Sequence, residues 1–429
     1  MRKLLEIILI PLAQAILAKR RPLVVAVAGT VGKTGTKNAI AAAVATHRSV
    51  RPSDKNNNTE IGAAVTVIGL PSAGRSVLGW IKVVGRGLSA LAGDGKDYPS
   101  VLVLEFGEQR PGDLVRLTKL FPPKIGVVTA IGATHGEALG GIEGVTKEFA
   151  GFVAALPADG LAVLSADDER VFALSAKTKA KVIRFGFGEA ATVRGVDPHP
   201  LIRRDDKRGL YVDGMTFKVE LGGNLIPATM PGVLGRPPVA AGLAAIAVAT
   251  YLGANQLAAV EGLQGFKPQK GRLRVLPGIK FASLIDDSYN ASTKSMIEAL
   301  RALRSIPLDE GEERIAVLGE MREMGAASEE EHRKVGAAVR EFEVDKLVTV
   351  GELARDIRRG AIEAGLPEDK ATHFADTEHA GKHVQQVMDR GDIVLVKGSR
   401  GLHMEAVVKE LLAEPLRAEE LLEFGEPTT

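Results

Sequence analysis

The stretch Val24–Thr36 constrains the fold of this chain more than any other part of the sequence. An apolar run suited to a buried strand ends at Gly29, and Lys33 and Thr34 follow Gly32 where a helical stretch begins. Glycines let the main chain approach a phosphate closely, and a helix N-terminus attracts an anion. Lys33 is of the type that pairs with terminal phosphates, and the Thr34 hydroxyl is of the type that ligates Mg²⁺. The stretch therefore predicts a nucleotide-binding phosphate loop.

This loop is a shortened form of the general pattern. It reads Gly29-Thr30-Val31-Gly32-Lys33-Thr34, and Val27 stands where the longer pattern has a further glycine. A plain strand-to-helix turn is the simpler alternative. The order of strand, glycines, lysine and helix favours nucleotide binding, with Gly29, Thr30 and Gly32 as backbone contacts.

Composition narrows the class of protein. At 429 residues the chain is long enough for about three domains of ~100–200 residues each. The formal net charge is +2, and no long basic run with interleaved aromatic residues suggests nucleic acid as a partner. Cysteine is absent, which excludes disulfides, thiolate metal sites and a cysteine nucleophile. If the chain uses a nucleotide, we expect it in the cytoplasm.

The N-terminal stretch from residue 4 to 18 is almost wholly apolar and has basic residues on both sides. It is shorter than the ~20 residues of a membrane-spanning helix. A packed helix is the favoured interpretation, and a helix lying on a membrane surface and a secretion signal are the alternatives.

A polar side chain follows each of two further predicted strands. The run Val101–Leu104 leads to Glu105, and the run Ile125–Thr129 leads to a loop that contains His135. Ligands of parallel α/β sheets bind beyond the carboxyl ends of the strands, so Thr34, Glu105 and His135 are candidates for one Mg²⁺ site. A helix cap or ion pair remains the alternative for Glu105, and a plain hydrogen bond for His135.

The alternation of strands and helices predicts an α/β protein. We expect an apolar helix at 1–22, a P-loop ATP-binding domain at 23–270 with a parallel sheet and a small antiparallel insertion, and a Rossmann-like doubly wound domain at 271–429. The strands and helices expected in 271–429 include no G-x-G-x-x-G turn, so dinucleotide binding is not expected in that domain.

Later motifs complete a family pattern. They are Asp286-Asp287-Ser288-Tyr289-Asn290, Leu318-Gly319-Glu320-Met321 and Val396-Lys397-Gly398-Ser399-Arg400. Together with the phosphate loop, their order resembles the Mur ligases, a family of ATP-dependent enzymes that form amide bonds. The resemblance is strongest to the branch that adds D-alanyl-D-alanine to a UDP-muramoyl-tripeptide, but without the N-terminal UDP-binding domain of that branch.

The resemblance implies roles for individual residues. Lys33, Glu105 and His135 are the implied catalytic residues, and Thr34 joins the last two as the implied Mg²⁺ ligands. Arg272 and Asp287 resemble the residues of the C-terminal domain that close on the ATP. Tyr289 and Asn290, beside them, resemble residues that line the nucleotide or the incoming amine. Lys397, Ser399 and Arg400 are candidates for the acidic substrate, with a simple helix cap as the alternative for that turn.

The chain departs from the family at one metal-organising position. The family usually has a lysine, carbamylated in the active enzyme, where this sequence has Phe149, and Lys147 points to another side of the same helix. The leading hypothesis is a ligase that uses ATP and Mg²⁺ in peptidoglycan precursor synthesis. A Mur-like ligase with another acceptor, of the pseudomurein or polyglutamyl type, and a non-catalytic nucleotide-binding partner subunit are the alternatives.

Overall fold

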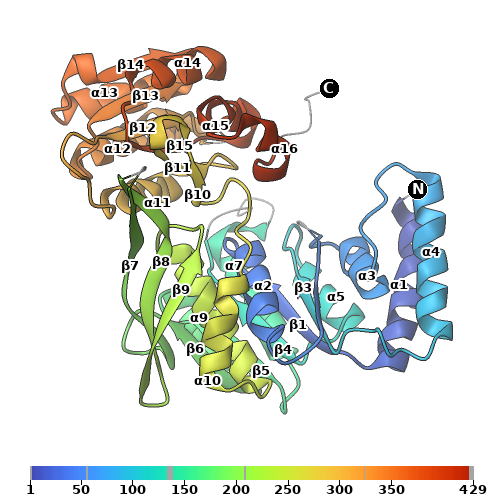
Figure 1. The fold of residues 1–429 in the computed structure, drawn as a ribbon. Helices are drawn as coiled ribbons and strands as arrows, with labels where there is room; N and C mark the ends of the chain where they lie inside the picture. Colours follow the sequence, from blue (N-terminus) through green and yellow to red (C-terminus); the bar gives the residue numbers. More distant parts are fainter. Residues whose placement is uncertain (1, 55–56, 133–138, 207–208, 323, 425–429) are drawn as a thin grey trace. The chain divides into compact units, whose positions relative to one another are not determined.

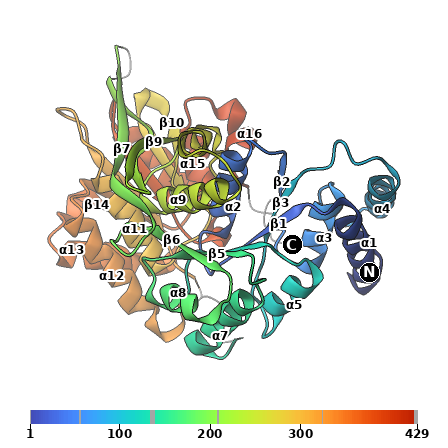
Figure 2. The same cartoon turned by 90° about the horizontal axis from the view of Figure 1, so that it is seen from below.

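The computed structural model describes residues 2–54, 57–132, 139–206, 209–322 and 324–424 (Figures 1 and 2). They form two compact units. The first contains Met1–Asp197, Phe217–Ala228 and Pro237–Lys267, and the second contains Pro198–Thr216, Thr229–Arg236 and Pro268–Thr429. The predicted domain limits at residues 22 and 270 remain predictions.

A nine-stranded sheet has the order β2-β3-β1-β4-β5-β6-β7-β8-β9. Its first six strands are β1 (Leu23–Ala28), β2 (Val50–Pro52), β3 (Val101–Glu105), β4 (Ile125–Val128), β5 (Leu161–Ser165) and β6 (Lys181–Gly186). Neighbours among these six pair in parallel. Strands β3, β4 and β5 are buried along their whole length, as expected for a parallel sheet that is covered on both faces.

Helices alternate with these strands. They are α1 (Arg2–Arg20), α2 (Lys33–Val44), α3 (Glu60–Ile68), α4 (Val77–Ala92), α5 (Asp113–Leu120), α7 (Gly141–Ala154), α8 (Glu169–Ala173), α9 (Arg236–Tyr251) and α10 (Gln256–Glu261). Val24, Ala26 and Ala28 of β1 join a hydrophobic core with residues of α1, α3, α5 and α7. Successive strand residues point to opposite faces, so the equally buried Val25 and Val27 face the other layer.

The last three strands of this sheet are β7 (Val193–Asp205), β8 (Gly209–Leu221) and β9 (Asn224–Pro231). Only Gly222 and Gly223 separate β8 from β9, and both have positive φ angles, 59° and 83°. A parallel connection needs a dozen or more residues, so these neighbouring strands form an antiparallel hairpin. Strand β7 pairs in parallel with the end of β6, so the β8–β9 hairpin is the part of the predicted antiparallel insertion that the structure supports.

The second unit contains a six-stranded sheet with the order β10-β11-β15-β12-β13-β14. Its strands are β10 (Arg274–Pro277), β11 (Ser283–Asp287), β12 (Arg314–Gly319), β13 (Lys346–Val350), β14 (Ala371–Phe374) and β15 (Ile393–Lys397). Strand β10 pairs antiparallel with β11, and the other neighbours pair in parallel.

The helices of this unit are α11 (Thr293–Arg304), α12 (Ser328–Glu341), α13 (Arg355–Glu363), α14 (Thr377–Val387), α15 (Glu405–Leu411) and α16 (Ala418–Leu421). The predicted fold class, α/β with a parallel sheet in each part, is confirmed. The order of the strands brings the carboxyl ends of β11, β15 and β12 side by side, and this edge carries Asp287 and Lys397 as register partners.

Candidate functional site

The loop between β1 and α2 has the backbone that a phosphate cradle requires. Gly29 has a φ of 146° and Gly32 a φ of 82°, and α2 begins at the next residue, Lys33. A Cβ added at Gly29 would lie only 1.9 Å from Thr129 Oγ1, so glycine is required there for space as well as for conformation. Thr30 N donates to the Ala130 carbonyl at 3.0 Å and ties the loop to the end of β4.

Lys33 lies in this loop beside an acidic side chain. Its Nζ is 3.3 Å from both carboxylate oxygens of Glu108, and it also donates to the Gly29 carbonyl. The Glu108 side chain is buried, with 1% of its surface exposed, against 14% for Lys33. The structure therefore brings a second acid to the phosphate loop, one that the sequence motifs did not indicate.

Thr34 and Glu105 meet, as predicted for a metal pair. Thr34 Oγ1 donates to Glu105 Oε2 at 2.9 Å, and Lys37 Nζ lies 3.8 Å from the same oxygen. Adjacent oxygen ligands of an octahedral Mg²⁺, each at about 2.1 Å from the metal, are separated by about 3 Å. The chemistry and the spacing of the two oxygens therefore fit Mg²⁺.

The third predicted ligand, His135, lies outside the described residues. Within the described part of the chain, no three His, Asp or Glu side chains gather as a metal site. Lys37 is almost completely buried, and burial lowers the pKa of its amine while the neighbouring carboxylate of Glu105 opposes that shift. Lys37 follows Lys33 by one helical turn, and this spacing was the signal in the sequence that we missed.

Helix α7 supplies no lysine at the family's metal-organising position. Phe149 is fully buried in the hydrophobic core, and the ring of Phe152, one turn further on, packs edge-on against Phe106 at 6.1 Å. Lys147 is exposed. As the helical spacing predicts, Lys147 and Phe149 therefore lie on different sides of α7.

In the second unit, Lys397 forms a buried ion pair with Asp287. Its Nζ lies 2.6 Å from Asp287 Oδ2 and 2.8 Å from the Asn290 carbonyl, and 1% of its side chain is exposed. Asp287 Oδ1 accepts from Leu273 N at 3.1 Å. Burial lowers the pKa of Lys397, and the charge of Asp287 opposes this shift. Lys397, which was predicted to meet the acidic substrate, thus contacts Asp287, which was predicted to bind ATP.

Two arginine side chains lie over the aromatic ring of Tyr289. The guanidinium carbons of Arg272 and Arg400 lie 4.3 and 4.5 Å from the centroid of its ring. Both arginines are exposed, so they combine a planar cation with access to solvent. The structure therefore gathers five of the predicted residues of this unit, and Asn290 joins them through its carbonyl.

Ser399 does not act as the helix cap that was the alternative for this turn. Its side chain makes no capping hydrogen bond to the short turn that follows it, and its Oγ accepts from Arg322 N at 2.9 Å. Arg322 Nε donates to Glu320 Oε1 at 2.8 Å. Asp286 accepts from Gly271 N and from Ser288 N and Oγ, and burial raises its pKa. These contacts hold the loops around Asp287 and Ser399 in place.

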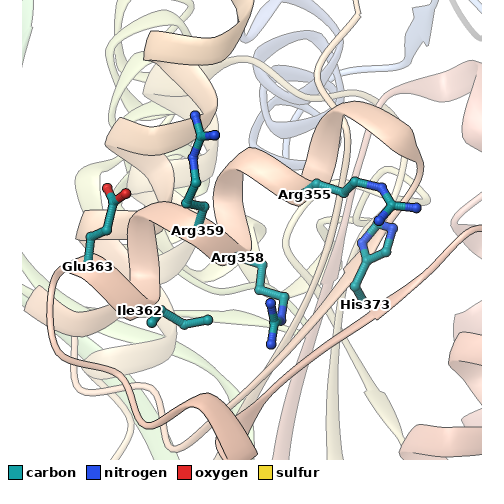
Figure 3. Close-up of a pocket in the computed structure, with 6 residues that line it drawn as sticks. All are labelled: Arg355, Arg358, Arg359, Ile362, Glu363 and His373. Carbon is teal, nitrogen blue, oxygen red and sulfur yellow. The ribbon is translucent and has the colours of Figure 1, made fainter.

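A separate hollow of about 290 Å³ lies between α13 and β14. Figure 3 shows Arg355 and His373 close together, with Arg358 between them and Ile362. The positive charges of these arginines are paired with acidic side chains. Arg358, for example, lies 3.0 Å from Glu368. Burial and the nearby Arg355 lower the pKa of His373. None of the predicted site residues lines this hollow.

Two family models match this chain. The Mur ligase middle domain matches residues 27–249, more than half of the chain, and the Mur ligase glutamate ligase domain matches residues 271–400. The UDP-N-acetylmuramoyl-tripeptide–D-alanyl-D-alanine ligase of Bacillus subtilis is 29% identical over 408 residues, which cover 94% of this chain and 79% of the relative. The ligase of the same name from Mycobacterium tuberculosis (strain CDC 1551 / Oshkosh) is 30% identical over 410 residues, covering 91% and 73%.

A solved structure shares the fold. MurF ligase from Thermotoga maritima, in complex with ADP, superposes with a TM-score of 0.73 at 24% identity and covers 96% of this chain and 84% of that one. The domain matches follow one another in the same order as the two α/β sheets described above. The chain belongs to the Mur ligase family.

Proposed function

We propose that this protein is an ATP-dependent ligase that joins D-alanyl-D-alanine, or an amino acid, to the peptide of a peptidoglycan precursor. The family and the names of its relatives support this assignment. The observation that carries it within the structure is the contact between Thr34 and Glu105 beside the phosphate loop, because it offers oxygen ligands where a nucleotide phosphate would lie.

The reaction has two steps. The carboxylate of the precursor attacks the γ-phosphorus of ATP, so a carboxyl oxygen–phosphorus bond forms and the bond to ADP breaks. The amine of the acceptor then attacks the acyl carbon. The bond between the acyl carbon and the phosphate oxygen breaks, phosphate leaves with the electron pair, and the nitrogen loses a proton to give the amide. Activation is needed because a carboxylate repels nucleophiles and oxide is a poor leaving group.

The first unit supplies the groups for phosphoryl transfer. The backbone amides after Gly29 and at Gly32 would hold the phosphates, with Thr30 at the turn, and Lys33 would balance the charge that develops on the transferred group. Mg²⁺, held by Thr34 and Glu105 with His135 as the proposed third ligand, would polarise the phosphate oxygens.

The second unit supplies recognition. Arg272, Tyr289 and Arg400 present a ring and two planar cations, which suit a nucleotide base and anionic groups. Asp287 is proposed to close on the ATP, and Asn290 to line the nucleotide or the incoming amine. Lys397, Ser399 and Arg400 are proposed for the acidic substrate, and the first two also organise the loops that carry the others.

The proposed reaction also implies a cellular compartment. Soluble substrates of this kind and ATP would place the enzyme in the cytoplasm. Contact between residues 4–18 and a membrane is a separate proposal that does not affect the chemistry.

Product analysis tests the reaction. The purified protein is incubated with ATP, Mg²⁺, a UDP-N-acetylmuramoyl-tripeptide and D-alanyl-D-alanine, and ADP release and product mass are measured. We expect ADP release to require both the precursor and the acceptor, and the product to be heavier than the precursor by the dipeptide less one water. Lys33→Ala, which removes the phosphate-loop amine, serves as the inactive control.

Other outcomes separate the alternatives. Product with a single amino acid in place of the dipeptide would keep the reaction class and change the acceptor. Absence of ADP release with every acceptor, together with activity that appears only when a second protein is added, would contradict the proposal and favour a nucleotide-binding partner subunit.

A further inference from the structure

The outward face of α1 is apolar. Leu4, Ile7 and Ile8 are exposed by 60%, 69% and 42%, and Pro11, Ala15 and Ala18 continue the exposed stripe toward the end of the helix. Their spacing of three or four residues places them on one side of the helix. The opposite side, with Leu9, Ala13 and Ile16, is buried in the core of the first unit. Helix α1 is therefore apolar on the side that faces water as well as on the side that faces the core.

Helix α4 repeats this arrangement. Leu78, Ile81 and Leu88 are exposed by 72%, 62% and 56%, and Gly85 and Ala92 are exposed at the positions that continue their stripe. The buried side of the same helix consists of Trp80, Val83, Gly87 and Ala90. Seven of the fifteen large apolar side chains exposed in the described chain lie on these two helices, so their exposure is concentrated rather than scattered.

The two helices lie side by side, which both views show (Figures 1 and 2). At their carboxyl ends, Lys19 Nζ donates to the Leu91 carbonyl at 2.6 Å and Arg20 Nε donates to the Ala90 carbonyl at 2.9 Å. Further up, a Cβ added at Gly87 would lie 2.5 Å from Leu12, so the helices approach closely at that glycine. The apolar stripes of α1 and α4 therefore form one continuous surface, which we call the docking face.

The segments that carry the docking face are rich in basic residues. Residues 1–22 and 71–92 contain eight lysines and arginines, namely Arg2, Lys3, Lys19, Arg20, Arg21, Arg75, Lys82 and Arg86. The same segments contain a single acid, Glu6, whereas the whole chain has 55 basic and 53 acidic residues. An exposed apolar stripe on segments rich in basic residues is the pattern of helices that lie in the interface of an anionic bilayer.

We propose that the docking face binds the surface of an anionic lipid bilayer, with α1 and α4 lying parallel to it. Among the described helices, none has the length and hydropathy needed to cross a bilayer, so the interaction is with the surface. A second copy of the chain fits the same face poorly, because a two-fold interface would bring the basic segments of one copy against those of the other.

Vesicle flotation tests this proposal. Vesicles of phosphatidylcholine alone and with added phosphatidylglycerol are mixed with the protein, and the partition coefficient is measured at low and high salt. We expect binding to require the anionic lipid and to weaken with salt. Lys82→Gln with Arg86→Gln should lower the partition coefficient about fivefold for each lysine or arginine lost. Lys177→Gln with Lys179→Gln, which changes two exposed lysines elsewhere in the first unit, should leave it unchanged.

The apolar contribution has its own pair of variants. Ile7→Ser with Ile81→Ser should weaken binding about tenfold or more, because it removes two side chains from the buried side of the membrane contact. Leu225→Ser with Leu257→Ser changes residues of similar exposure, 55% and 57%, outside the docking face and should have no effect. Circular dichroism and the melting temperature confirm that all variants fold.

Two results would overturn the proposal. One is wild-type protein that does not float with anionic vesicles at low salt. The other is a dimer in gel filtration that the Ile7→Ser/Ile81→Ser variant dissociates without any change in vesicle binding. Neither result depends on ligase activity, so the proposed reaction stands or falls separately.

Discussion

The amine of Lys33 lies 3.3 Å from both carboxylate oxygens of Glu108, and the Glu108 side chain is almost wholly buried. A phosphate and this carboxylate would compete for the same amine. Lys33 is thus both the proposed phosphate ligand and one of the groups that stabilise a buried acid. Mutation of either residue has two effects, on turnover and on stability, and these can be separated.

Replacement of Lys33 by Ala should lower acceptor-dependent ATP turnover by about a hundredfold or more, because it removes a cation from the transferred phosphoryl group. It should also lower the melting temperature, because the buried side chain of Glu108 loses this cationic partner. The double variant Lys33→Ala/Glu108→Gln should recover the melting temperature without recovering turnover. Lys119→Ala, an exposed lysine on α5, is the matched control. Wild-type turnover in Lys33→Ala would show that the phosphate loop is misassigned.

Replacement of Glu105 by Gln should raise the Mg²⁺ concentration needed for half-maximal turnover, because an amide oxygen binds a hard cation more weakly than a carboxylate does. Binding of Mn²⁺, followed by electron paramagnetic resonance in the presence of nucleotide, gives a readout that does not depend on turnover. The exposed Glu143 on α7 provides the control variant Glu143→Gln. Unchanged Mn²⁺ affinity in Glu105→Gln would remove Glu105 from the metal site.

The conformation of the loop between β1 and α2 was predictable because its signal is local. Gly29, Gly32 and Lys33 lie within five residues, and each has a conformational or chemical role that can be recognised without knowing the rest of the fold. The meeting of Thr34 with Glu105 was also predictable, since both follow the carboxyl ends of strands in one parallel sheet.

The pairing of Asp287 with Lys397 was not predictable in the same way. The two residues are 110 positions apart, and they meet because β15 inserts between β11 and β12 in the sheet. Apolar strands of similar length do not reveal their order within a sheet. Glu108 was missed for a related reason, because its position depends on the path of the loop after β3 and not on a periodic pattern.

Stability at alkaline pH should depend on Tyr98. Its hydroxyl donates to the Val67 carbonyl at 2.7 Å, and burial raises the pKa of Tyr98 from 10.0 to about 12. Above pH 10 the unfolded chain loses this proton before the folded one does, so the free energy of unfolding should fall by about 1 kcal/mol between pH 10 and 11. Urea unfolding of wild type and Tyr98→Phe at pH 7, 10 and 11 measures this difference. Tyr251→Phe should keep the wild-type decline, and an equal decline in Tyr98→Phe would assign it to other groups.

The ion pair between Lys397 and Asp287 raises the question of whether Lys397 serves the substrate or only the fold. Lys397→Met leaves the carboxylate of Asp287 buried without its 2.6 Å partner, and we expect a loss of about 3 kcal/mol in the free energy of unfolding. Lys397→Met/Asp287→Asn removes both charges, while the Asn side-chain oxygen retains an acceptor for Leu273 N.

This double variant should therefore recover most of the stability, as measured by urea unfolding. If Lys397 and Asp287 act on the substrates, ligase activity should stay low in the double variant despite its stable fold, with a raised KM for ATP or for the precursor. Wild-type activity in the stable double variant would limit the pair to a structural role and leave recognition to Tyr289 and its two arginines.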